Sequence, residues 1–130
     1  MKRMLWLIPA LAALALTGCG SQKTEPLPAK PAVPTIVFAT NPTPLHVNQE
    51  GSLTATVTVN TDPVKQATVE FEIWGDSDAA NHEKLPAASD DNGHYSIKKT
   101  FAKADIYHVT IHTTTRDVHT MPTVEFQVAP

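Results

Sequence analysis

Strict alternation of apolar and polar residues is the feature that most constrains what this 130-residue chain can fold into. Within Leu53–Val59 every second residue is apolar, and a threonine occupies each position between. Successive side chains of a strand point to opposite faces, so this pattern predicts a strand with one buried face. No stretch of residues 35–130 shows a convincing helical periodicity. We therefore expect an all-β domain.

The same alternation recurs in further segments that run to the end of the chain. The expected strands are residues 35–40, 44–47, 52–60, 67–74, 83–88, 94–101, 106–114 and 124–128. Their expected inward-facing residues after position 60 are Val69, Phe71, Ile73, Tyr95, Ile97, Phe101, Tyr107, Val109, Ile111, Thr113, Val124, Phe126 and Val128. Seven to eight short strands in about 95 residues are typical of an immunoglobulin-like β-sandwich. We expect this fold over residues 35–130.

Three local signals add detail to this expectation. Asp91-Asn92-Gly93 predicts a hairpin turn, because asparagine and glycine tolerate positive φ. Pro86 predicts that its strand lies at a sheet edge, since proline cannot donate to a ladder. Tyr107 near the start of the penultimate strand resembles the tyrosine corner of immunoglobulin-like folds. This structural role is favoured over a binding role for Tyr107.

The first 18 residues read as a lipoprotein signal peptide. Lys2 and Arg3 precede an apolar stretch, Leu5–Leu16, which is too short for the about 20 residues of a membrane-spanning helix. The stretch ends at Leu16-Thr17-Gly18-Cys19, a lipobox. We expect cleavage before Cys19 and a covalent lipid, such as palmitate, on that cysteine. The predicted location is the extracytoplasmic face of the cell membrane.

Residues 19–34 form the expected tether between the lipid and the domain. Four prolines, Pro26, Pro28, Pro31 and Pro34, favour a polyproline II conformation. Cys19 is the only cysteine, so the exported domain has neither a disulfide nor a free thiol. Loss of Lys2 and Arg3 changes the formal net charge from −3 to −5, which argues against a nucleic-acid partner.

Enzyme motifs are absent from the sequence. There is no Gly-x-Ser-x-Gly elbow, no cysteine nucleophile in the domain and no glycine-rich phosphate loop. We expect a protein that is not an enzyme, and a hydrolase with a dispersed site is the weaker alternative.

The candidate functional side chains are the six histidines, all of which follow Cys19: His46, His82, His94, His108, His112 and His119. His108 and His112 share one face of a strand but lie about 13 Å apart at 3.3 Å per residue. Bonds of about 2 Å cannot join both to one ion, so one of the two is excluded, and we leave out His108, which lies midway along the strand beside Thr110. His46 and His94 are interpreted as ordinary surface residues.

The last two strands predict a metal site. The chain turns back after His112, which brings His119 and Met121 alongside that strand. His119 and Met121 are two residues apart, so in an extended segment their side chains lie on the same side. Imidazole with thioether favours copper, and Met121 suits Cu(I) in particular. His82 is a candidate fourth ligand. Solvated surface histidines with a packed Met121 remain the alternative at this point.

Several blocks together resemble a known family. They are His82-Glu83, residues 92–96, residues 99–101, residues 106–112 and residues 116–122. In this order they resemble the YtkA-like domain, related to FixH-like domains, of lipoproteins from Bacillus-type bacteria, over about residues 50–129. The resemblance implies an immunoglobulin-like fold, and FixH-like relatives are associated with assembly of copper-containing respiratory oxidases. Asp105-Ile106 departs from the family pattern, in which a glycine often precedes the corner.

Two hypotheses follow. The leading one is a lipid-anchored β-sandwich that binds or delivers copper through His112, His119 and Met121, with His82 as a possible fourth ligand. Glu83 would orient one of these imidazoles, as carboxylates often do beside metal ligands. The rival is a structural or protein-interaction module that contacts an envelope partner through a sheet edge or loops.

Overall fold

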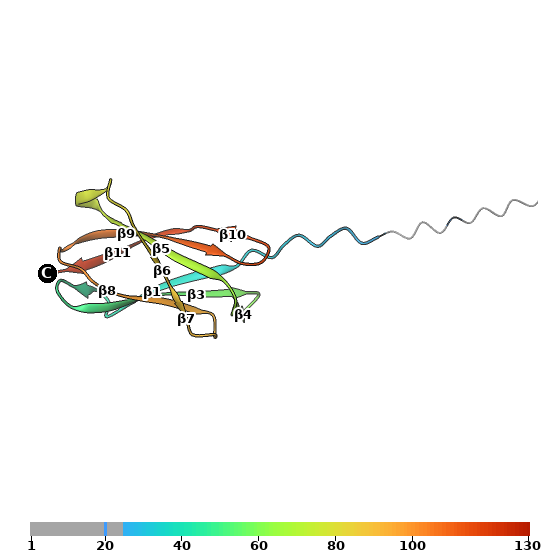
Figure 1. The fold of residues 1–130 in the computed structure, drawn as a ribbon, viewed down its shortest axis with the longest axis horizontal. Coiled ribbons are helices and arrows are strands. Elements are labelled where there is room, and N and C mark those ends of the chain that lie inside the picture. Colours follow the sequence, from blue (N-terminus) through green and yellow to red (C-terminus); the bar gives the residue numbers. More distant parts are fainter. Residues whose placement is uncertain (1–19, 21–24) are drawn as a thin grey trace, which may run out of the picture.

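The computed structural model describes residue 20 and residues 25–130. The predicted signal peptide, residues 1–18, and Cys19 lie outside this part of the chain. Residues 25–34 form neither helix nor strand and lead into the first strand from one end of the domain (Figure 1). Within the described residues, no helix has the length and apolar character to cross a membrane.

Eleven strands and one short 3₁₀ helix make up the described domain. The strands are β1 (Thr35–Asn41), β2 (Leu45–His46), β3 (Glu50–Val59), β4 (Asp62–Pro63), β5 (Thr68–Gly75), β6 (Glu83–Pro86), β7 (Ala88–Ser89), β8 (His94–Thr100), β9 (Asp105–Thr114), β10 (His119–Thr120) and β11 (Thr123–Ala129). The 3₁₀ helix η1 (Asp76–Asp78) follows β5. The longer strands match the segments expected from alternation, so the all-β prediction is confirmed.

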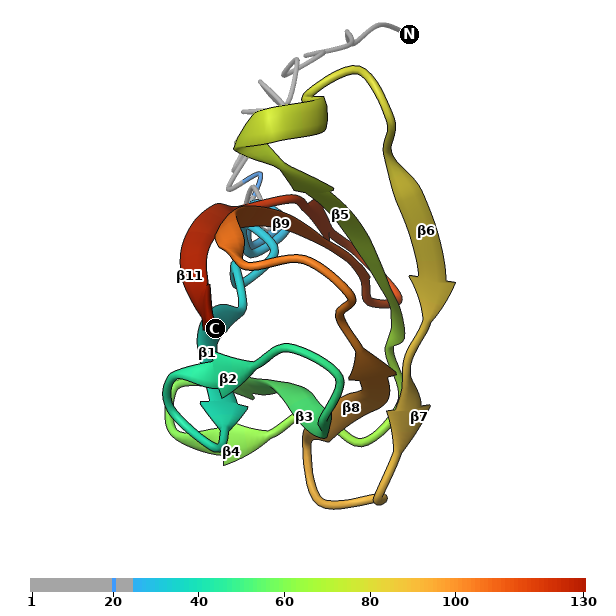
Figure 2. The same cartoon turned by 90° about the vertical axis from the view of Figure 1, so that its left-hand side faces the viewer.

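The strands form two sheets packed as a sandwich. One sheet has the order β1-β3-β8-β7, with β4 paired to β3, and the other has the order β2-β11-β9-β5-β6, with β10 paired to β9. Figure 2 shows the two sheets as layers, with β6 and β7 following one another along one side. The Pro86 strand, β6, lies at a sheet edge as predicted.

The core lies between the facing rows of the two sheets. Leu53, Ala55 and Val57 of β3 are fully buried, as are Phe71 of β5 and Ile111 of β9. These residues come from the alternating positions, and burial of a large apolar side chain contributes about 1.5–3 kcal/mol. The inner rows thus fix which side chains of β5 and β9 point outward.

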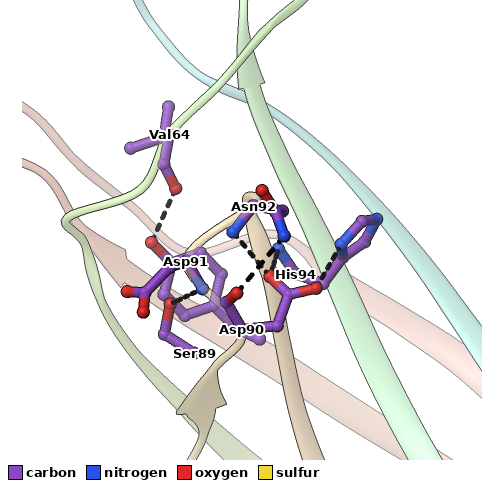
Figure 3. Close-up of polar contacts among 7 residues, drawn as sticks. Val64, Ser89, Asp90, Asp91, Asn92 and His94 are labelled. Atoms are coloured by element: carbon purple, nitrogen blue, oxygen red, sulfur yellow. Dashed lines mark hydrogen bonds and ion pairs between the residues drawn. The ribbon is translucent and has the colours of Figure 1, made fainter.

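Two turn and corner predictions are also confirmed. Asp91 and Gly93 have φ of 63° and 85°, and the Asp90 carboxylate accepts hydrogen bonds from the backbone of Asn92 and His94 (Figure 3). The Tyr107 hydroxyl donates to the Lys103 carbonyl oxygen at 3.0 Å, which is the tyrosine-corner bond. Burial raises the pKa of Tyr107, so this phenol keeps its proton as a donor.

Candidate metal site on the outer face of β5, β9 and β10

A single carboxylate links two of the predicted histidines. Glu72 projects outward from β5, where it accepts from Nδ1 of His82 at 2.8 Å and from Nε2 of His112 at 2.5 Å. His112 belongs to the neighbouring strand β9, whereas His82 lies in the loop before β6. His82 and His112 therefore meet on one carboxylate, although 30 residues separate them in sequence.

The two hydrogen bonds also set the electrostatics of Glu72. The bond from His82 is the largest cause that lowers the pKa of Glu72, and the bond from His112 is the second. Desolvation opposes them. Glu72 is therefore an anion at neutral pH, and its side chain is only 23% exposed.

The strand register places three of the predicted ligands in adjacent positions. His119 of β10 pairs with Thr114 of β9, and Thr123 of β11 pairs with Thr110 in the same register. Between them, the Ile111 amide donates to the Pro122 carbonyl oxygen at 2.8 Å. Residues 121–122 belong to no strand, but β10 and β11 pair with β9 at the same offset on either side of them, and this offset puts Met121 at the register position of His112. The Met121 side chain is exposed and retains 56% of its accessible surface.

The imidazoles of His112 and His119 lie close enough to share an ion. Their ring centres are 6.0 Å apart, with planes inclined by 33°. A metal–nitrogen bond is about 2.0 Å, so two imidazoles on one ion have ring centres at most about 6.5 Å apart. His119 Nδ1 bonds to the Thr114 hydroxyl at 2.8 Å. Among the described residues, His112 Nδ1 and His119 Nε2 have no hydrogen-bond partner.

His82 differs from the other two histidines because both of its ring nitrogens are engaged. Nδ1 bonds to Glu72, and Nε2 lies 3.0 Å from the Ala79 carbonyl oxygen. The ring stacks on the Trp74 indole at 4.3 Å with an interplanar angle of 2°. His82 is therefore held behind Glu72, and the structure does not place it as a free fourth ligand.

The loop that carries His82 is itself attached to β9. The Asp105 carboxylate accepts from the amide and the hydroxyl of Ser77 at 2.9 and 2.6 Å. His108 bonds to Asp76 through Nε2 at 2.5 Å, and its ring stacks on Trp74 at 5.3 Å. His108, which was left out of the predicted metal site, thus attaches this loop to β9.

Glu83 does not have the position that the sequence suggested. Its carboxylate forms an ion pair with Lys99 at 2.5 Å. In the part of the chain that the structure describes, the carboxylate that contacts the imidazoles is Glu72. Glu83 is the first residue of β6 and reaches Lys99 of β8, whereas His82 belongs to the preceding loop and turns toward β5. The alternation of residues 67–74 predicts that Glu72 points outward, but the identity of its partners depends on the order of the strands in the sheet.

The remaining two histidines lie away from the candidate ligands, His46 on β2 at the far edge of the same sheet and His94 on β8. His46 Nδ1 lies 3.2 Å from the Pro130 carbonyl oxygen. His94 belongs to the other sheet and pairs with Asp90 of its own hairpin at 2.8 Å (Figure 3). Both positions agree with their interpretation as surface residues.

The donor atoms fit a soft metal better than a hard one. Within residues 25–130, no group of three or more histidine, cysteine, aspartate or glutamate side chains is arranged to hold a metal ion. Glu72 is engaged by two imidazoles, and the other donors near His112 are the His119 ring and, by strand register, the Glu70 carboxylate and the Met121 thioether. Imidazole and thioether ligands suit copper, whereas calcium and magnesium require oxygen ligands.

Comparison with known proteins identifies the family. The model of the YtkA-like family matches residues 29–112. The chain belongs to the YtkA-like family. The matched range contains Glu72, His82 and His112, whereas His119 and Met121 follow its end. No curated protein matches the chain.

Solved structures match the chain at low sequence identity. The soluble domain of PmoD from Methylocystis sp. ATCC 49242 is 15% identical, with a TM-score of 0.47, over 65% of this chain and 76% of its own. The alkylpurine DNA glycosylase AlkC of Pseudomonas fluorescens, bound to DNA with an abasic site analogue, is 10% identical, with a TM-score of 0.50, over 76% of this chain and 31% of its own. At this identity the likeness concerns the fold alone.

Proposed function

We propose that this protein is a membrane-anchored, extracytoplasmic domain that binds a copper ion as cargo. The ligands are Nδ1 of His112, Nε2 of His119 and the sulfur of Met121, on the outer face of β9 and β10. The observation that carries the proposal is the pair of unpartnered ring nitrogens on imidazoles whose centres are 6.0 Å apart, beside the position of Met121.

Hydrogen bonds on the far side of each imidazole support this assignment. Metal-bound histidines generally donate their other N–H to an oxygen acceptor, which fixes the ring orientation. Glu72 can have this role for His112, and the Thr114 hydroxyl can have it for His119. Binding of an ion by the remaining nitrogen of each ring would then leave these two hydrogen bonds in place.

The position of the site suits exchange of an ion with another protein. Met121 is 56% exposed, and it lines a surface pocket with Val33, Pro34 and Ile36 at the start of the domain. A lipid on Cys19 and the tether of residues 19–34 would keep this surface near the membrane. The resemblance to FixH-related domains favours an envelope or respiratory-oxidase assembly protein as the partner.

The test is a titration of residues 20–130 with Cu(I) in competition with a chelator of known affinity. We expect one tight equivalent, lost in the variant His112→Ala/His119→Ala/Met121→Leu. His94→Ala is the matched control, because it removes an imidazole bonded to a carboxylate on the other sheet. Circular dichroism checks that each variant is folded. Equal binding by wild type and triple variant would reject the proposal and favour a protein-interaction module.

A further inference from the structure

We infer that Glu72 is a positioning residue for the copper site and that His82 holds Glu72 in place. This inference rests on the proposed function, since it assigns the side chains that prepare His112 to bind the ion. Glu72 reaches His112 and His82 only through hydrogen bonds. It can therefore set the orientation and the tautomer of the His112 imidazole without binding the ion itself.

The first step of the argument concerns His112. A neutral imidazole carries its proton on one of its two nitrogens and accepts at the other. The Glu72 carboxylate lies 2.5 Å from Nε2 of His112, and a carboxylate anion is an acceptor only. In the neutral ring the proton is therefore held on Nε2, and the lone pair is left on Nδ1, the nitrogen that has no hydrogen-bond partner among the described residues.

The second step concerns Glu72 itself. A carboxylate on a surface strand has several rotamers, and one bond to His112 leaves the other oxygen without a fixed partner. His82 supplies that partner through Nδ1 at 2.8 Å. The His82 ring is fixed in turn by stacking on Trp74 at 4.3 Å, and its Nε2 faces the Ala79 carbonyl oxygen, to which it donates only when the ring is doubly protonated. The carboxylate is thus held from both sides.

The third step concerns the loop between β5 and β6, which carries His82. Its attachment to the start of β9 uses Ser77 with Asp105 and Asp76 with His108. None of these residues reaches the predicted ligands, yet together they determine where the His82 ring lies. The loop therefore acts on the site through one imidazole and one carboxylate.

The decisive experiment reads the tautomer of His112 in the metal-free chain of residues 20–130. Long-range ¹H–¹⁵N correlation spectra distinguish a protonated from an unprotonated ring nitrogen. In the wild type at neutral pH we expect Nε2 of His112 protonated and Nδ1 unprotonated. In Glu72→Ala we expect a mixture of tautomers, whereas Asp90→Ala, which removes the carboxylate beside His94, leaves His112 unchanged.

Copper affinity supplies the second readout. Loss of a carboxylate that orients a metal-binding histidine costs about 10–100-fold in affinity. We expect a loss in this range for Glu72→Ala and a smaller one for His82→Ala. Glu72→Gln should restore part of the affinity, because the amide oxygen can still accept from Nε2 of His112.

The two proposals fail in different ways. An unchanged His112 tautomer in Glu72→Ala would overturn the positioning role, whatever the copper affinity. If the wild type binds no copper but the His112 tautomer still changes in Glu72→Ala, the copper function is rejected. The conclusion that Glu72 determines this tautomer then stands. Copper binding that is equal in wild type, Glu72→Ala and His82→Ala would also overturn the positioning role.

Discussion

Two histidine–carboxylate pairs on opposite sheets show how the same residue types differ in their roles. His94 bonds to Asp90 four residues away, within the hairpin that begins β8 (Figure 3). His112 bonds to Glu72 across 40 residues and between two long strands. The first pair closes a turn that already needs Asp90 for backbone amides, so a structural role accounts for it. The second pair has no turn to close.

The surroundings of the two pairs differ in the same way. The outer row of β3, next to His94, consists of one carboxylate at its start followed by hydroxyl side chains: Glu50, Ser52, Thr54, Thr56 and Thr58. The outer face that contains His112 also carries His108, Glu72, Trp74 and the neighbouring His119. Polar side chains of moderate size are sufficient for a strand that faces water. The concentration of titratable and aromatic groups on β5 and β9 is the reason why the proposed site is assigned to this face.

The largest predicted effect tests whether both faces depend on one core. Phe71 is fully buried between the sheets, directly beneath the histidine face. Phe71→Ala should lower the free energy of unfolding by about 3–5 kcal/mol, because it removes a large apolar side chain and leaves a cavity. Urea unfolding followed by circular dichroism measures this change. Thr56→Ala, on the outer row of β3, should change the free energy of unfolding by less than about 0.5 kcal/mol.

The next prediction compares one tyrosine from each sheet. The Tyr95 hydroxyl donates to the Val64 carbonyl oxygen at 2.6 Å and accepts from the Ala67 amide at 3.0 Å, and Tyr95 is almost fully buried. Tyr107 makes the single corner bond to Lys103. Tyr95→Phe should lower the free energy of unfolding by about 2 kcal/mol and Tyr107→Phe by about 1 kcal/mol. Equal losses in thermal or urea unfolding would contradict this ranking.

The smallest predicted effect is the pH dependence of the two carboxylates. The pKa of Glu72 is lowered in the folded state, mainly by its bond from His82, so its ionised form stabilises the fold. This contribution is present above the ordinary glutamate pKa and is lost as the pH falls through the lowered folded-state value. Glu72→Gln should therefore reduce Tm at pH 6–7 by a few degrees, with a difference that shrinks below about pH 4.

Asp90→Asn is the matched variant for that experiment. The pKa of Asp90 is also lowered, mainly by the Asn92 backbone amide. An asparagine side chain can still accept from that amide, so Tm should change less than in Glu72→Gln. Scanning calorimetry from pH 3 to pH 7 measures both variants, and a larger change in Asp90→Asn would contradict the assignment.

The sequence predicted the fold well because alternation is a local signal. Leu53, Phe71 and Ile111 lie in the core as expected, since the period of two determines which face a residue occupies. The hairpin at Asp91 and the corner at Tyr107 were recognisable for the same reason, because each depends on a few adjacent residues.

The site was only partly predictable because its contacts cross between strands. The proximity of His112 and His119 followed from the return of the chain after β9, which is a short-range property. The link from Glu72 to His82 depends on β5 lying between β9 and β6, and strand order has no local signal. Sequence alone therefore favours Glu83 as the orienting carboxylate, whereas in the structure His82 bonds to Glu72.

The most direct test of the central claim is anomalous diffraction at the copper edge from crystals of residues 20–130 soaked with Cu(I) under anaerobic conditions. The account predicts one strong peak about 2 Å from Nδ1 of His112 and from Nε2 of His119, with the Met121 sulfur beside it. A peak at His46 or His94 with none on the outer face of β9 and β10, or no peak at any histidine, would contradict it.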